Sequence, residues 1–136
     1  MKGILLLSHG DMAKAMLQSS SIFFGDDIKQ VEALDFQMTD DSDLFEEKIG
    51  KCIERIDDGD GVIILTDLYA GTPAHKTTKY LSSGKVDVIC GMNLPLFIEL
   101  INKREIGEID IDELVEIGQQ SILPWRILNK TDDEFF

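Results

Sequence analysis

Four short, mostly apolar runs separated by amphipathic stretches constrain the fold of this chain more than any other feature of its sequence. The runs are Gly3–Ser8, Val31–Phe36, Gly61–Thr66 and Val86–Cys90. They read as continuous apolar segments rather than strict alternations, a pattern typical of strands buried on both faces. Such strands occur in parallel sheets with helices covering each side. The sequence therefore predicts an α/β fold with an open, mainly parallel sheet of about four strands.

Amphipathic stretches between these runs predict helices. The segment Met12–Phe24 follows the first run and gives the first helix. The second helix has a clearer period, because four apolar residues recur at spacings that stack them on one helical face: Phe45, Ile49, Cys52 and Ile56.

Three further helices follow from local start signals. A helix should begin at Thr72-Pro73, because Thr is a good N-cap and Pro suits the first helical position. Another begins near Pro95, and the last spans Ile111–Gln120 with Asp110 as its cap.

The C-terminal segment Ser121–Leu128 turns apolar again but contains Pro124. Because proline suits an edge strand or an irregular segment, this stretch either runs antiparallel at the sheet edge or reaches onto a neighbouring subunit. We expect a single domain over residues 1–130, followed by an acidic tail at 131–136.

The charge balance disfavours nucleic-acid binding. Acidic residues outnumber basic ones by 26 to 13, for a formal net charge of −13 at pH 7. The arginines, Arg55, Arg104 and Arg126, are scattered, so no basic stripe exists to neutralise phosphates. An acidic surface fits plain solubility as well as a basic protein partner.

The sequence also argues against membrane insertion, secretion and cysteine chemistry. No apolar run approaches the roughly 20 residues that span a bilayer, and no basic segment precedes the first run, so we expect a cytoplasmic protein. Cys52 and Cys90 lie among apolar residues without CxxC spacing, which predicts free thiols rather than a metal site or a redox pair.

Ionisable side chains follow two of the predicted strands directly. The first run ends at His9 and the third is followed by Asp67. In an open parallel sheet the sites form outside the carboxyl ends of the strands. If these strands are neighbours, the carboxylate accepts from one ring N–H of the imidazole, and the other nitrogen faces outward with its lone pair. This arrangement predicts that His9 acts as a nucleophile and that Asp67 orients it.

The residues around this pair suit an anion such as a phosphoryl group. Gly10 and Gly71 allow backbone N–H groups to approach closely, and predicted helices begin just after His9 and at Thr72. The Thr72 hydroxyl is a further donor. His75, in the first turn of the third helix, is expected to be exposed and without a direct role.

Other chemistries lack their sequence motifs. The chain has no GxGxxG or GxxxxGK[ST] nucleotide loop and no GxSxG elbow. A metal site would need more than one well-placed histidine. We therefore expect neither a metal nor a cofactor.

Taken together, these residues resemble the IIA domain of the mannose-type phosphotransferase system for sugar uptake, and the similarity covers almost the whole chain. Four motifs in order carry the resemblance: Ser8-His9-Gly10, Asp35-Phe36, Thr66-Asp67-Leu68 followed by Gly71-Thr72-Pro73, and Gly91-Met92-Asn93-Leu94-Pro95.

The resemblance implies a phosphoryl-carrier function. The residue matching His9 would take a phosphoryl group from the phosphocarrier protein HPr and pass it to a IIB component, upstream of the membrane components IIC and IID. The residue matching Asp67 would orient the imidazole, and Thr72, which is Ser in many members, would keep a hydroxyl near the phosphate. The family forms homodimers, in some members by exchanging the last strand, which would account for Ser121–Leu128.

Three alternatives remain beside this interpretation. A subunit that delivers phosphate to a dihydroxyacetone kinase shares the expected fold, but Gly10 and Thr72-Pro73 argue against it. A histidine phosphatase would need an arginine where Ser8 stands and a second phosphate clamp. A non-catalytic α/β binding module could use the same crevice without covalent chemistry.

Overall fold

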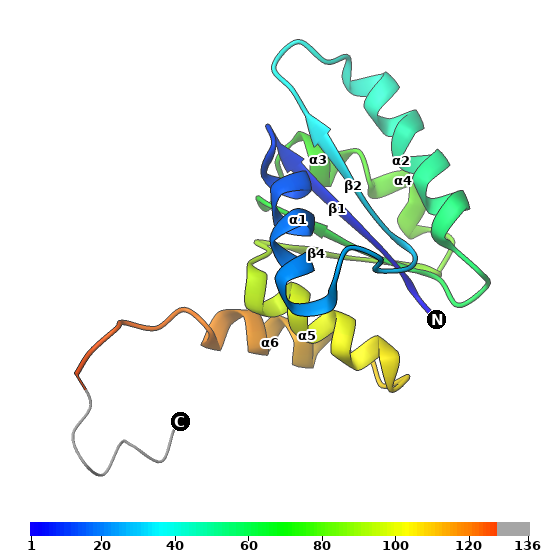
Figure 1. The fold of residues 1–136 in the computed structure, drawn as a ribbon. Coiled ribbons are helices and arrows are strands. Elements are labelled where there is room, and N and C mark those ends of the chain that lie inside the picture. The colour runs from blue at the N-terminus through cyan, green and yellow to red at the C-terminus, as the bar shows by residue number, and fades with distance from the viewer. Residues whose placement is uncertain (128–136) are drawn as a thin grey trace.

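A four-stranded, fully parallel sheet in the order β2-β1-β3-β4 forms the centre of the molecule (Figure 1). The structure is a computed structural model and describes residues 1–127. The strand bounds are β1 Gly3–His9, β2 Val31–Phe36, β3 Val62–Thr66 and β4 Val86–Cys90. All four predicted strands are confirmed, as is the α/β class.

Helices cover both faces of this sheet. On one face lie α1 (Met12–Phe24), α5 (Leu94–Glu105) and α6 (Ile111–Gln120), and on the other lie α2 (Ser42–Ile56) and α4 (Thr78–Leu81) (Figure 1). The short helix α3 (Thr72–His75) contacts β1.

The central strand β1 supplies both halves of the core. Ile4 and Leu6 pack with α1 and α5, whereas Leu5 and Leu7 pack with the apolar face of α2. All four side chains are fully buried. This two-sided burial is why the run Gly3–Ser8 has no polar alternation.

The helix predictions are confirmed except in the third helical segment. There the structure has two short helices, α3 and α4, in place of one, and Gly71 rather than Thr72 is the N-cap of α3, so that Pro73 is its second residue. Thr77 lies between them, and its hydroxyl donates to the Ala74 carbonyl at 2.6 Å. Its backbone N–H bonds the same carbonyl, three residues back, so local threonine bonding tightens and interrupts the helical ladder.

The C-terminal segment leaves the body of the molecule after α6 (Figure 1). Residues 122–127 form neither helix nor strand, and the side chains of Ile122, Leu123, Trp125 and Ile127 are largely exposed. Within residues 1–127 the segment is therefore not an antiparallel edge strand of its own sheet, as one alternative expected. The prediction that it reaches a neighbouring subunit is untested, and the acidic tail at 131–136 lies outside the described residues.

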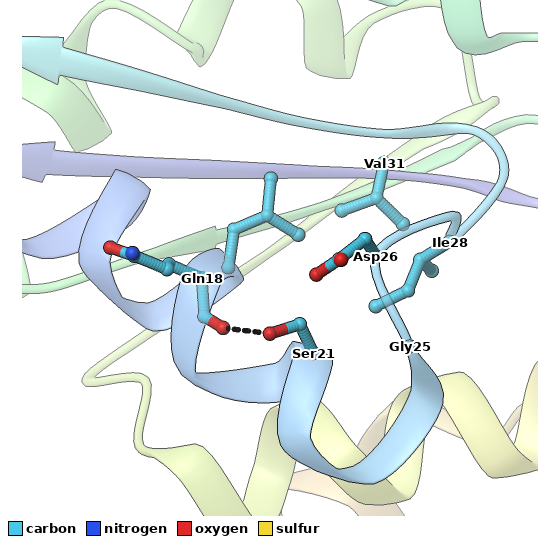
Figure 2. A pocket seen from close by; sticks show the side chains of 7 residues that line it. Gln18, Ser21, Gly25, Asp26, Ile28 and Val31 are labelled. Carbon is cyan, nitrogen blue, oxygen red and sulfur yellow. Dashed lines mark hydrogen bonds between the residues drawn. The ribbon is translucent and has the colours of Figure 1, made fainter.

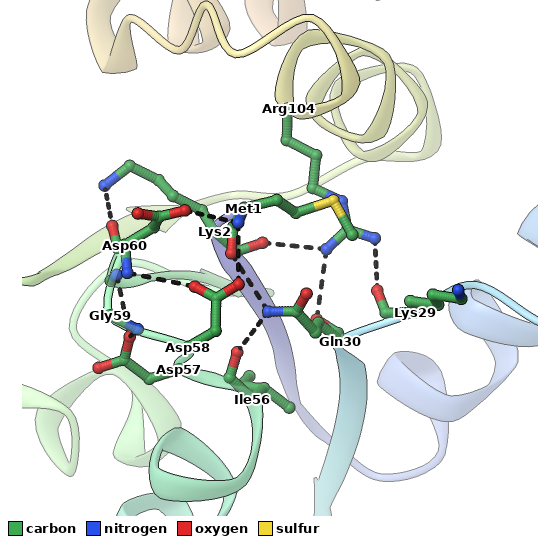
Figure 3. Close-up of polar contacts among 11 residues, drawn as sticks. Met1, Lys2, Lys29, Gln30, Ile56, Asp57, Asp58, Gly59, Asp60 and Arg104 are labelled. Carbon is green, nitrogen blue, oxygen red and sulfur yellow. Dashed lines mark hydrogen bonds and ion pairs between the residues drawn. The ribbon is translucent and has the colours of Figure 1, made fainter.

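A buried arginine fastens the amino ends of the strands to α5. Figure 3 shows the guanidinium of Arg104 donating to the backbone carbonyls of Lys2, Lys29 and Gln30. The residue is 3% exposed, and burial lowers the pKa of its guanidinium from the usual value. This contact lies at the amino ends of the strands, whereas His9 lies at their carboxyl ends.

No helix in the described chain combines the length and hydropathy needed to cross a bilayer.

Candidate active site

His9 and Asp67 lie against each other at the carboxyl ends of two neighbouring strands. His9 is the last residue of β1, and Asp67 directly follows β3. One carboxylate oxygen of Asp67, Oδ2, accepts the backbone N–H of His9 at 2.8 Å and lies 2.9 Å from its ring atom Nδ1. The other oxygen, Oδ1, accepts the backbone N–H of Leu68. Both oxygens of Asp67 are thus engaged in fixing the geometry of this pair.

This contact determines which ring nitrogen of His9 carries the free lone pair. A carboxylate only accepts hydrogen bonds, so in the neutral imidazole Nδ1 carries the proton and Nε2 carries the lone pair. The side chain of His9 is 42% exposed, whereas that of Asp67 is 9% exposed. An exposed imidazole with a free lone pair beside a buried carboxylate is an arrangement that suits nucleophilic catalysis.

Gly71 packs directly on the imidazole. A Cβ atom at this position would lie 2.7 Å from His9 Cε1 and 3.4 Å from Nε2, so no larger residue fits without displacing the ring. The preceding residue, Ala70, has a φ of 60°, a conformation that L-residues with a side chain adopt rarely. The loop from Asp67 to Gly71 therefore brings its backbone against the imidazole of His9.

The Gly71 side of the imidazole offers hydrogen-bond donors. Thr72 opens α3, and Pro73 follows it. Among residues 1–127, the backbone N–H groups of Gly71 and Thr72 have no acceptor, nor does the Thr72 hydroxyl have a partner. These donors are therefore free to bind another acceptor.

The α1 side of the site differs from the sequence-based expectation. Gly10 has a φ of 58° and so needs to be glycine for the turn, but its N–H already donates to the Phe36 carbonyl at 2.9 Å. The expected approach of this amide to a phosphate is not seen. The N–H groups of Ala13 and Lys14 in the first turn of α1 are also occupied, because they donate to side chains of β1 and β2.

These side chains, Ser8 and Asp35, were missed as site residues by the sequence reasoning. Ser8 is fully buried, and the carboxylate of Asp35 is 5% exposed. Each is a polar residue one position before the end of its strand, and this is the signal that the sequence offers.

Apolar side chains surround the exposed edge of His9. A shallow hollow beside it is lined by Gly10, Phe36, Gln37 and Met38. The Phe36 ring meets the imidazole edge-on, with 6.5 Å between centroids. Met38 and Tyr69, on the loops beside the site, are 99% and 88% exposed. Such a rim suits contact with another protein.

The remaining candidates stand apart from this site. A second hollow, between α1 and the start of β2, is lined by Gln18, Ser21, Asp26 and apolar neighbours and contains no histidine (Figure 2). His75 is exposed at the end of α3, as expected. Cys52 and Cys90 are free thiols. Residues 1–127 contain no group of three or more His, Cys, Asp or Glu side chains arranged to hold a metal ion.

Comparison with known proteins connects this fold and site to a family. Residues 3–118 match the family described as PTS system fructose IIA component, EIIA-man. The PTS system fructose-specific EIIA component of Bacillus subtilis is 26% identical over 124 residues, which cover 89% of this chain and 84% of that protein. The PTS system mannose-specific EIIAB component of Escherichia coli K12 is 24% identical, over 87% of this chain and 36% of that longer protein.

A solved structure gives the same result. The PTS IIA protein associated with the fucose utilization operon of Streptococcus pneumoniae superposes with a TM-score of 0.83 at 30% identity, over 90% of this chain and 92% of that one. The chain belongs to the EIIA-man family of phosphotransferase-system IIA components. It is a component of the phosphotransfer machinery for sugar uptake.

Proposed function

We propose that His9 is a transient phosphoryl carrier, which accepts a phosphoryl group from HPr on Nε2 and passes it to a IIB component. The observation that carries this proposal is the contact of His9 Nδ1 with Asp67 at 2.9 Å, which leaves Nε2 as the exposed nucleophile. Family membership indicates phosphoryl transfer as the class of chemistry. The geometry favours Nε2 of His9 as the atom that takes the phosphoryl group.

The transfer conserves bonds and charge at each step. The lone pair on Nε2 attacks the phosphorus of the donor's phosphohistidine, a new N–P bond forms, and the donor's N–P bond breaks with its electron pair returning to the donor nitrogen. The carboxylate of Asp67 stabilises the positive charge that the imidazole gains as its second nitrogen is substituted. The handover to IIB repeats these events with His9 as the donor.

Gly71 and Thr72 support the phosphoryl group in this proposal. Their backbone N–H groups and the Thr72 hydroxyl are donors without an acceptor in residues 1–127, and a Cβ at Gly71 would lie 3.4 Å from Nε2 of His9. Donors fixed before the reaction stabilise developing charge without reorganisation. Because the phosphoryl group must leave again, a few neutral donors suit the task better than a cluster of arginines.

The surroundings of His9 fit a relay between proteins. The exposed apolar side chains of Met38, Leu68 and Tyr69 flank the site, and the chain carries a net charge of −13. Charge complementarity with a basic carrier raises the encounter rate more than the affinity, which suits a partner that has to be released.

We further propose a homodimer in which the C-terminal segment crosses to the partner. Four exposed apolar residues follow α6 without packing on their own subunit, namely Ile122, Leu123, Trp125 and Ile127. β4 ends the sheet order, so one side of it has no neighbouring strand within residues 1–127. An exposed strand edge and an unpaired apolar segment are complementary by β-augmentation. Sedimentation equilibrium of the full chain and of a chain ending at Ser121 tests this, and a monomeric full chain would refute it.

Intact mass spectrometry tests the carrier function. The protein is incubated with phosphoenolpyruvate, enzyme I and HPr, and the mass is recorded before and after brief acid treatment. We expect one acid-labile phosphate adduct, which His9→Ala abolishes and His75→Ala retains. An unmodified wild-type protein, with HPr itself phosphorylated in the same tube, would refute the proposal.

A further inference from the structure

Two polar side chains, Ser8 of β1 and Asp35 of β2, hold the turn that follows His9. The two residues are direct neighbours in the sheet register. The Ser8 hydroxyl donates to the Gly10 carbonyl at 3.1 Å and accepts the Ala13 N–H at 2.7 Å. The turn that carries the nucleophile is thus bonded to a side chain lying beneath it.

Asp35 binds the next amide of the same helix. Its Oδ1 accepts the backbone N–H of Lys14 at 3.3 Å, and its Oδ2 lies 3.8 Å from the Lys14 ammonium. Asp11, which stands at the N-cap position of α1, forms no capping bond with its side chain. The start of α1 is therefore capped from inside the fold, by one hydroxyl and one buried carboxylate.

A buried carboxylate at a helix N-terminus has an electrostatic consequence. The first turn of a helix carries a partial positive charge that attracts anions, phosphate included. Here Asp35 already supplies that anion. A phosphoryl group on His9 consequently meets a helix start at which the amides of Ala13 and Lys14 are bonded and a carboxylate offsets the positive potential.

We propose that Asp35 is a positioning residue that prevents the phosphoryl group from binding at the start of α1. The phosphoryl group then binds the donors of Gly71 and Thr72 instead. The inference rests on the carrier function proposed above and adds a regulatory property to it. Because Asp35 offsets the positive potential at the start of α1, this helix does not stabilise the phosphohistidine. The phosphoryl group therefore passes readily to the next protein.

The substitution Asp35→Asn tests this, because the amide keeps the size and an acceptor oxygen but removes the charge. The equilibrium constant for phosphoryl exchange with HPr is measured with 32P label, together with kcat, KM and the thermal midpoint. We expect the equilibrium to shift toward the phosphorylated protein by about two- to fivefold, the range for one charge at a helix terminus. A merely structural cap would lower the thermal midpoint and leave that equilibrium in place.

A matched control removes one carboxylate of the same kind elsewhere. Glu54 is exposed on α2 and forms no ion pair within residues 1–127, so Glu54→Gln should leave the equilibrium unchanged. If Asp35→Asn does not fold, Lys14→Met serves instead. That variant removes the cation that partly neutralises Asp35, and the equilibrium should then shift away from the phosphorylated protein by a similar factor.

The outcomes separate this inference from the function on which it rests. If wild-type protein accepts no phosphate from HPr, both fall. If the wild type is phosphorylated and Asp35→Asn, correctly folded, leaves the equilibrium unchanged or shifts it toward HPr, only the role of Asp35 is overturned. With Lys14→Met as the variant, an unchanged equilibrium overturns that role in the same way.

Discussion

A single oxygen of Asp67 contacts His9 twice, accepting the backbone N–H at 2.8 Å and lying 2.9 Å from Nδ1 of the ring. The first contact fixes the end of β1, and the second fixes the ring plane and its tautomer. Because one oxygen makes both contacts, the orientation of the imidazole is coupled directly to the position of the backbone that carries it.

Replacing Asp67 with Asn should separate folding from reactivity. An amide oxygen in the place of Oδ2 can still accept both N–H groups of His9, so the domain should fold, but the amide lacks the negative charge that stabilises the phosphorylated imidazole. Replacing an aspartate that orients a catalytic histidine with asparagine can cost about 10⁴-fold in rate, and we expect a loss of about 100-fold or more in the single-turnover rate of phosphorylation by HPr. Rapid-quench kinetics measures the rate, with the exposed Asp87→Asn as the matched control. Equal rates in Asp67→Asn and wild type would contradict the orienting role.

Substituting Gly71 with Ala should displace the imidazole. The added methyl group would lie 2.7 Å from Cε1 of His9, well inside van der Waals contact. We expect a destabilisation of about 1–3 kcal/mol, typical of overpacking, and slower phosphorylation. Urea unfolding and the chemical shifts of the His9 ring protons measure the two effects. Ring shifts identical to wild type would show that Gly71 does not set the position of the imidazole.

Much of this geometry follows from the sequence because it depends on local signals or on simple topology. The caps Asp41, Asn93 and Asp110 accept backbone N–H groups within three residues of themselves, so they can be recognised from their neighbours. The meeting of His9 and Asp67 needed only one additional assumption, that β1 and β3 are adjacent.

The features that escaped prediction depend on contacts far apart in the chain or on competing local bonds. Arg104 donates to the Lys2 carbonyl, which lies 102 residues earlier in the chain. No local sequence pattern near either residue predicts this contact. The interruption at Thr77 comes from a hydroxyl that competes with the helical ladder. Asp35 reads in sequence as a strand-end residue, and only the register with Ser8 reveals its contact with α1.

Cys52 should make stability depend on alkaline pH. Burial, assisted by the nearby charge of Glu32, raises the pKa of its thiol from 9.0 to about 11. The unfolded chain therefore loses this proton before the folded one does. The contribution is fully present below pH 9 and is lost as the pH rises from 9 toward 11. Urea unfolding of wild type and Cys52→Ala at pH 8 and pH 10 measures it, and the wild type should lose more stability between these values. Parallel losses in the two proteins would contradict the raised pKa.

Removing the guanidinium of Arg104 should destabilise the fold without altering the chemistry at His9. Arg104→Met keeps most of the buried aliphatic volume but leaves the carbonyls of Lys2, Lys29 and Gln30 without this donor. Leaving buried acceptors unpaired costs about 1–3 kcal/mol, and we expect a loss of that size in urea unfolding. Lys51→Met, at an exposed position on α2, is the control and should be neutral. Because Arg104 contacts the amino ends of the strands, the folded variant should accept phosphate from HPr at the wild-type rate. A slower rate in fully folded protein would show that contacts at the amino ends of the strands affect the site at their carboxyl ends.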